Sequence, residues 1–125
     1  MANPNIVDVQ TIKGNTVYLI PANTTANTWT ALTANANYVN RVDFMTASNV
    51  TSAAATVTVS INSATSGGGT AYRLAYQISV PAYATLVVLD KTTAMYVGES
   101  QSVVVTVGTA SAIELVASYE EISDT

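Results

Sequence analysis

The strict alternation of apolar and polar residues over residues 56–62 is the feature that most constrains the fold. The run Thr-Val-Thr-Val-Ser-Ile-Asn places Val57, Val59 and Ile61 on one side of an extended chain, with hydroxyl side chains opposite. β-Branched residues fit such a pleated, half-buried strand. This segment therefore predicts a strand with one face against an apolar core.

Two longer segments repeat the alternation. Over residues 71–80, the face predicted to point inward comprises Tyr72, Leu74, Tyr76, Ile78 and Val80. Over residues 113–120, the corresponding face comprises Ile113, Leu115, Ala117 and Tyr119. Each segment therefore predicts a further strand that covers the same interior.

Other strands are predicted from shorter patterns. In residues 39–46 we expect Val42 and Phe44 to point inward, with Arg41 and Asp43 outward. Residues 86–89 and 103–107 are continuous apolar runs, which predict either central strands buried on both faces or strands covered by a partner. Residues 6–12 and 17–20 are expected to pair as a hairpin through Gly14 and Asn15.

Turn-forming residues separate these segments. Residues 62–69 end in three glycines and predict a mobile hairpin tip, while residues 80–82 and 97–100 predict two further turns. Residues 21–37 are rich in Thr and Asn, which disfavour helix interiors. We expect a long surface connection there, with a short strand at residues 28–33.

About eight short strands with turns between them indicate an antiparallel sandwich or barrel. We predict an all-β chain with one antiparallel β-sandwich, of immunoglobulin-like or jelly-roll type. No repeat, linker or charge run divides the 125 residues, so residues 1–125 are expected to form one domain, with residues 1–5 as an N-terminal arm.

The composition limits the kinds of partner. Only 10% of the residues are charged, and the net charge is −4. The four basic residues are scattered singly along the chain: Lys13, Arg41, Arg73 and Lys91. Because nucleic acids and anionic membranes are bound by clustered Lys and Arg, we expect neither as a partner. Residues 1–8 lack the pattern of a secretory signal, and no apolar run is long enough for a membrane span.

The chain lacks the commonest catalytic and metal-binding side chains. It has no His and no Cys, which removes the usual general base and every thiolate ligand. The remaining carboxylates considered for paired acid–base chemistry are Asp43, Asp90, Glu99 and Glu114. No pattern brings any two together, so we expect surface charges, no catalytic residue, no cofactor and no enzymatic activity.

Three further motifs favour structural roles. Glu120, Glu121 and Asp124 suggest a weak calcium site, but they lack the spacing of an oxygen-ligand loop and fit a solubilising acidic terminus better. Residues 67–69 lack the Lys of a phosphate loop, so no nucleotide site is predicted there. No metal site is predicted either. The sequons at residues 23–25 and 49–51 are interpreted as chance matches in a chain rich in Asn and Thr.

Three aromatic residues, Tyr72, Tyr76 and Trp29, each have two possible roles. Tyr72 and Tyr76 are interpreted as core or subunit-contact residues, because Tyr buries a large area and keeps a polar tip. Trp29 lies in the Thr- and Asn-rich connection. It either pins this long loop to the core, which we favour, or stacks on a sugar ring. The residues of any binding surface are left unassigned.

The order of several segments resembles a known group of proteins. The segments are residues 21–25 (Pro-Ala-Asn-Thr-Thr), 41–49 (Arg-Val-Asp-Phe-Met-Thr-Ala-Ser-Asn), 53–61, 80–82, 86–91, 96–100 and 113–122. In this order, across about residues 16–122, the chain resembles small virion structural proteins of tailed bacteriophages, including phages of cyanobacteria. The resemblance implies a β-sandwich part of the particle without catalysis, and it supplies no catalytic residues.

The place within such a particle has three interpretations. The short chain and the N-terminal arm favour a capsid decoration or cement protein on the outer surface of the virion, bound to the major capsid protein and to copies of itself. A tail, neck or fibre component is the alternative. A carbohydrate-binding module is the third choice, and it depends on Trp29.

Overall fold

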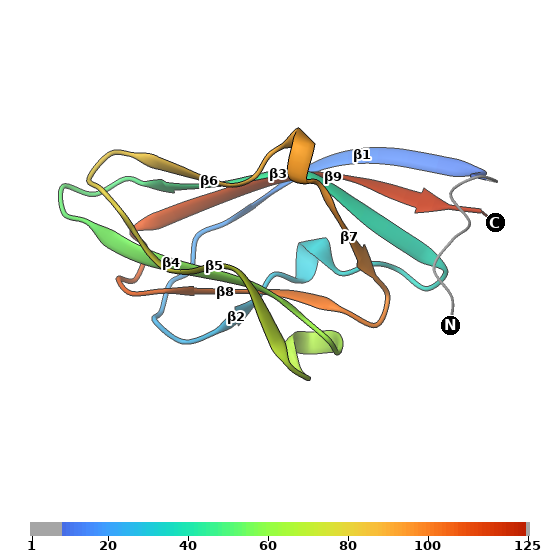
Figure 1. Ribbon diagram of the computed structural model, residues 1–125, viewed down its shortest axis with the longest axis horizontal. Helices are drawn as coiled ribbons and strands as arrows, with labels where there is room; N and C mark the ends of the chain where they lie inside the picture. Colours follow the sequence, from blue (N-terminus) through green and yellow to red (C-terminus); the bar gives the residue numbers. More distant parts are fainter. Residues whose placement is uncertain (1–8, 125) are drawn as a thin grey trace.

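The computed structural model describes residues 9–124, which form antiparallel strands joined by turns and by three short 3-10 helices (Figure 1). The five-stranded sheet has the order β1-β9-β3-β6, with β7 also paired to β3. Its strands are β1 (Thr11–Leu19), β3 (Tyr38–Asn49), β6 (Thr85–Leu89), β7 (Met95–Gly98) and β9 (Ile113–Ser123). The four-stranded sheet has the order β2-β8-β4-β5. Its strands are β2 (Asn27–Thr28), β4 (Ala55–Asn62), β5 (Ala71–Val80) and β8 (Ser102–Val107).

The two sheets lie as layers with an apolar interior between them (Figure 1). Val57 and Val59 of β4 face inward from one sheet, and Leu115 and Ala117 of β9 face inward from the other, all four fully buried. The prediction of an all-β antiparallel sandwich is confirmed. The inward faces predicted for residues 56–62 and 113–120 are confirmed as well, because an alternating strand presents every second side chain to the core.

Strand β8 is buried on both faces, as its apolar run predicts. It lies between β2 and β4, and its outward Val104 is covered by the loop after β4. This loop joins the antiparallel pair β4 and β5, so the predicted hairpin is confirmed, but its tip is held on β8 instead of being mobile. The buried Ser102 hydroxyl accepts a hydrogen bond from the Gly67 N–H at 2.9 Å and donates one to the Ala64 carbonyl at 2.7 Å.

Glycine is required where this loop touches β2. Gly67 has a φ of +77°, and a Cβ atom there would lie 2.6 Å from the Thr28 hydroxyl oxygen. A side chain would therefore be strained and would push the loop away from the sheet. The glycine run predicted as a flexible turn allows this close approach instead.

The connection from residue 21 to residue 37 is anchored in the core. The strand expected at residues 28–33 is limited to β2, and a 3-10 helix, η1 (Thr30–Leu32), follows it. Trp29 is 2% exposed and Leu32 is fully buried in the cluster between the sheets. The interpretation that Trp29 pins the loop is confirmed, and most other residues of the connection lie on the surface, as expected.

A β-bulge overturns one predicted orientation in β3. Val42 is paired with Tyr119 and Phe44 with Ser118, so Asp43 is an extra residue on the β3 side. The bulge shifts the alternation by one position, and Phe44 therefore points outward, 37% exposed, while Met45 is buried. Val42 points inward as predicted.

Two bulges interrupt the alternation in β5, which is also an edge strand of its sheet. Val57 pairs with Ile78 and Val59 with Ala75, so β5 has one extra residue between these two pairs. The next pair is Ser60 with Arg73, so β5 has a second extra residue, Leu74, between Ala75 and Arg73. Gln77 adopts a φ of +47°, and its N–H donates to the Thr58 hydroxyl at 2.8 Å. Only Val80 of the predicted inward stripe is buried, and the others are exposed: Tyr72, Leu74, Tyr76 and Ile78.

Two edge strands also differ from expectation. Strand β6 pairs only with β3, and its Val87 is exposed, so the prediction of a central strand at residues 86–89 is wrong. Strand β1 runs straight through Gly14 and Asn15 in continuous register with β9, so the predicted hairpin is wrong. Neither residue has the positive φ that such a two-residue turn needs. Residues 6–8 of that hairpin and the arm at residues 1–5 lie outside the described residues.

Three loops use the same Asx-turn with a threonine two residues later. In the first, the Asn23 side-chain oxygen accepts from the Thr25 N–H and hydroxyl. The second is Asn49 with Thr51 and the third is Asp90 with Thr92, each with the same two hydrogen bonds. This geometry explains both sequon matches, because Asn-X-Thr lets one side chain close the turn. Asn49 is also buried, and its amide donates to the Ala53 and Val80 carbonyls.

We expect Trp29→Ala to lower the free energy of unfolding by about 3–5 kcal/mol, because it leaves a cavity between the sheets. Trp29→Phe should cost less than half of that. The indole Nε1 has no acceptor among the described residues, so Phe loses contact area but no hydrogen bond. Urea unfolding followed by circular dichroism measures both. Equal losses in the two variants would show that the indole nitrogen has a role that this structure does not contain.

Candidate functional site

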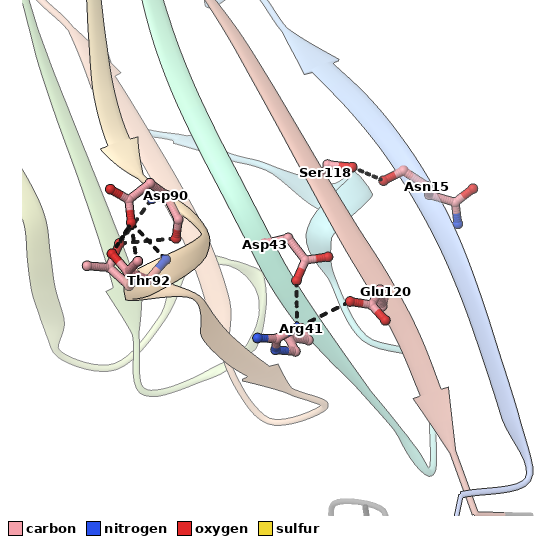
Figure 2. A network of polar contacts seen from close by, with 8 residues as sticks. Asn15, Arg41, Asp43, Asp90, Thr92, Ser118 and Glu120 are labelled. Atoms are coloured by element: carbon pink, nitrogen blue, oxygen red, sulfur yellow. Dashed lines mark hydrogen bonds and ion pairs between the residues drawn. The ribbon is translucent and has the colours of Figure 1, made fainter.

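The most charged cluster on the described surface is centred on Arg41 of β3. Its guanidinium Nη1 lies 2.9 Å from Oδ1 of Asp43 and 3.4 Å from Oε1 of Glu120 on β9 (Figure 2). Both acids reach the same arginine because Glu120 is its direct cross-strand partner and Asp43 lies two residues along the same strand. The sequence placed no two carboxylates together, and this pair was missed because it depends on the pairing of β3 with β9.

Glu120 has a raised pKa. The main cause is its hydrogen bond with the Asp43 carboxyl, followed by burial and by the like charge of Asp43, while Arg41 acts in the opposite direction. Since the folded chain binds this proton more tightly than the unfolded chain, the group stabilises the fold at acidic pH. That contribution is lost as the pH rises through the folded pKa. The three side chains are about one-quarter to one-third exposed, so the effect is less than about 1 kcal/mol.

The Arg41 cluster has the properties of a structural ion-pair network. One arginine shared by two carboxylates compensates one of their two negative charges, and all three groups project from the outward face of paired strands. A glycosidase needs one free carboxylate and one acid on either side of a bound sugar. The geometry instead links β3 to β9 and makes their contact sensitive to pH.

The other candidate carboxylates are separate from this cluster. The Asp90 side chain accepts hydrogen bonds from the Thr92 and Thr93 N–H groups and caps the 3-10 helix η3 (Lys91–Thr93) (Figure 2). These bonds, with the Thr92 hydroxyl bond as the largest cause, lower the pKa of Asp90. Glu99 accepts from the Asn37 N–H at 2.8 Å, and Glu114 is exposed on β9. Asp90 and Glu99 therefore hold turns.

The acidic C-terminal residues do not form a calcium site in the described chain. Glu120 and Glu121 are neighbours in β9 and so point to opposite sides of the sheet. Among residues 9–124, no group of three or more His, Cys, Asp and Glu residues is arranged to hold a metal ion. Glu120 and Glu121, which were expected to belong to a solubilising acidic terminus, lie partly exposed in the paired strand β9. No helix within the described part of the chain is long and apolar enough to cross a membrane.

Exposed apolar side chains are the more distinctive surface feature. Strand β5 carries four of them, with Tyr72 61% and Tyr76 57% exposed. The Arg73 guanidinium carbon lies 5.0 Å from the centre of the Tyr76 ring, so the strand's basic residue stacks on its own aromatic neighbour. We call these four residues, Tyr72, Leu74, Tyr76 and Ile78, the β5 surface. The sequence pattern predicted that all four face inward, because alternation alone does not show that β5 is an edge strand with two bulges.

The structure also places the aromatic and basic residues for which the sequence predicted a role. Trp29 is buried and presents no face to a ligand, so the sugar-stacking alternative is wrong. Tyr72 and Tyr76 are exposed, so of the two alternatives for them the core role is wrong. The four basic residues lie on four different elements, β1, β3, β5 and η3. No two of them share a strand or helix, as their spacing in the sequence suggested.

We expect Asp43→Asn to lower the pKa of Glu120, because it removes the main group that raises this value and leaves Arg41 in place. Carbon-detected NMR titration of the Glu120 carboxyl measures the change. Asp90→Asn is the control, since Asp90 lies in the separate η3 cap and should leave the Glu120 titration unchanged. A Glu120 pKa that stays the same or rises in Asp43→Asn would contradict the assigned cause.

Comparison with known proteins gives one informative likeness. No family model and no curated protein matches the sequence. Among solved structures, a protein of the disulfide-linked pili known as Bacillus endospore appendages is similar, with a TM-score of 0.52 and 16% sequence identity. The similarity covers 98% of this chain and 93% of that chain. At this identity it shows a shared fold, which extends over almost the whole length of both chains.

Proposed function

We propose that the chain is a non-enzymatic structural subunit of an assembled particle, and specifically a capsid decoration protein on the outer surface of a bacteriophage virion. The single observation that carries the proposal is the β5 surface, where two aromatic and two aliphatic side chains are exposed on one edge strand. Large exposed apolar groups gathered on one element are typical of protein-binding sites. The major capsid protein is the proposed partner.

The rest of the surface is compatible with permanent docking. With 10% charged residues, the chain has few ionic groups to desolvate when a partner covers it. Tyr supplies a large contact area and keeps a hydroxyl for hydrogen bonding, which suits the partly wet rim of an interface. Many weakly bound copies on one lattice would also gain from avidity.

A second candidate is a subunit of a tail, fibre or other filament. The likeness to a pilus protein favours it, because that likeness covers nearly all of this chain. The covalent link named for those pili has no counterpart here, since this chain has no Cys. A filament of this chain would therefore be held by non-covalent contacts alone. The carbohydrate-binding alternative depended on an accessible Trp29, and this side chain is buried.

The location of the chain in purified particles tests the proposal. Mass spectrometry should detect it in hundreds of copies per virion, and cryo-electron microscopy should place it on the outside of the head. Density for this fold only in the tail or in a separate filament would support the second candidate and overturn the first. Absence of the chain from purified particles would overturn both.

We expect Tyr76→Ser to weaken binding to undecorated heads by about tenfold or more, as for an aromatic residue at the centre of an interface. The variant should keep its native melting temperature within a few degrees, because the side chain is exposed. Tyr96→Ser on β7 is the matched control, since it removes an exposed Tyr from the other sheet. Equal binding by the two variants would show that the β5 surface is not the docking site.

A further inference from the structure

The free edges of the two sheets are protected to different degrees. A free strand edge presents unpaired backbone N–H and C=O groups to any extended chain, and proteins usually shorten, bulge or cover such edges. In the four-stranded sheet, one edge is the two-residue strand β2 and the other is β5 with its two bulges. In the five-stranded sheet, one side is divided between the short strands β6 and β7.

The remaining edge, β1, lacks these protections. It is nine residues long, it pairs with β9 in one unbroken register, and among the described residues it has no strand on its other side (Figure 1). It contains no proline, and its single charged residue is Lys13. Of the four described sheet edges, β1 is therefore the best template for pairing with another chain.

A glycine in the middle of β1 also favours pairing of this edge with another chain. Gly14 has no positive φ, and a Cβ atom added to it would meet nothing within 4 Å. Nothing within the described chain therefore requires glycine at this position. A glycine inside a strand weakens it, and it often marks the close approach of another backbone.

We propose that two copies of this chain pair through their β1 edges in antiparallel register, with Asn15 of each copy at the two-fold axis. This inference rests on the proposed function and adds the surface by which copies bind each other. Residues 17 and 19 face the core, opposite the buried Ala117 and Leu115, so the even-numbered residues of β1 face outward. A two-fold axis perpendicular to the sheet places the outward faces of both copies on the same side of the joined sheet. Directly opposite residues share a face, so each even-numbered residue of one β1 lies opposite an even-numbered residue of the other.

The sequence of β1 is self-complementary in this register. Ile12 lies opposite Tyr18 of the second copy, and these two side chains are 58% and 73% exposed in the single chain. Gly14 lies opposite Thr16 of the second copy and diagonally beside its Tyr18. An aromatic ring on a neighbouring strand covers a strand glycine in this geometry. The symmetry provides each of these contacts twice.

The charges also fit a second copy. Lys13 lies opposite Val17 of the other chain, so the two Lys13 side chains do not face each other. On β9, Glu121 is the direct partner of Lys13 within each copy. The paired sheets would form one continuous sheet across the dimer, in the order β6-β3-β9-β1 followed by β1-β9-β3-β6 of the second copy.

Cysteine cross-linking tests the register directly, because the chain contains no native Cys. Directly opposed residues in an antiparallel pair have Cα atoms about 4.5–5.5 Å apart, which suits a disulfide or a short bismaleimide link. Asn15→Cys should therefore give a cross-linked dimer in high yield. Ile12→Cys is the matched control, because its two copies would be roughly 20 Å apart.

A mixture of two variants provides a second measurement that does not depend on Asn15. Gly14→Cys and Thr16→Cys should cross-link more efficiently with each other than either does alone, because position 14 lies opposite position 16. Both substitutions are sterically mild, since Gly14 faces open space and Thr16 is exposed. Equal yields from all these variants would indicate random collision and overturn the register.

Sedimentation velocity then measures the dissociation constant of the dimer. Tyr18→Thr should raise the dimer dissociation constant by about tenfold, because it removes two aromatic cross-strand contacts per dimer. Tyr72→Thr removes an equally accessible Tyr from β5 and should leave that constant unchanged. A native chain that remains monomeric, or a dimer weakened equally by both variants, would overturn the β1 pairing.

The two proposals fail in different ways. If the chain is found on particles but Asn15→Cys gives no cross-linked dimer there or in solution, the β1 pairing is wrong and the structural function stands. If the dimer forms in the predicted register but the chain is absent from particles, the pairing stands and the proposed location is wrong.

Discussion

The packing of the two sheets against each other is the interaction on which the rest of this structure depends. The central strands β3, β4, β8 and β9 contribute most of the apolar side chains between the layers, and neither metal nor disulfide adds to them in the described chain. Trp29 and Leu32 extend this interior beyond the strands and tie the long connection to it. Because burial of apolar area is the main favourable term in folding, this contact also fixes the path of the connection that carries Trp29 and Leu32.

Irregularities at the sheet margins then determine what the surface offers. The bulge in β3 turns Phe44 outward, and the edge strand β5, with its two bulges, carries four exposed apolar side chains. The same bulges protect β5 from edge-to-edge pairing, while β1 keeps a regular free edge. The described surface of this sparsely charged protein thus has two distinct features, the exposed apolar side chains of β5 and the regular free edge of β1.

Several polar residues of the described chain stabilise turns. Asn23, Asn49 and Asp90 each close a loop with a threonine two residues later, and Ser102 fixes the loop after β4. Such local hydrogen bonds satisfy backbone groups that no strand can pair. The Asn-X-Thr motifs at residues 23–25 and 49–51 are accounted for by such turns.

The sequence by itself determined the fold class, the strands around residues 56–62, 103–107 and 113–120, and the absence of His and Cys chemistry. Period-two alternation carries this information because it is local to each strand. Only the tertiary structure decided that Phe44 and Tyr76 point outward, that β6 is an edge, and that Asp43 and Glu120 share Arg41. These features depend on how neighbouring strands are registered. A bulge shifts that register by one residue and leaves no mark in the local pattern.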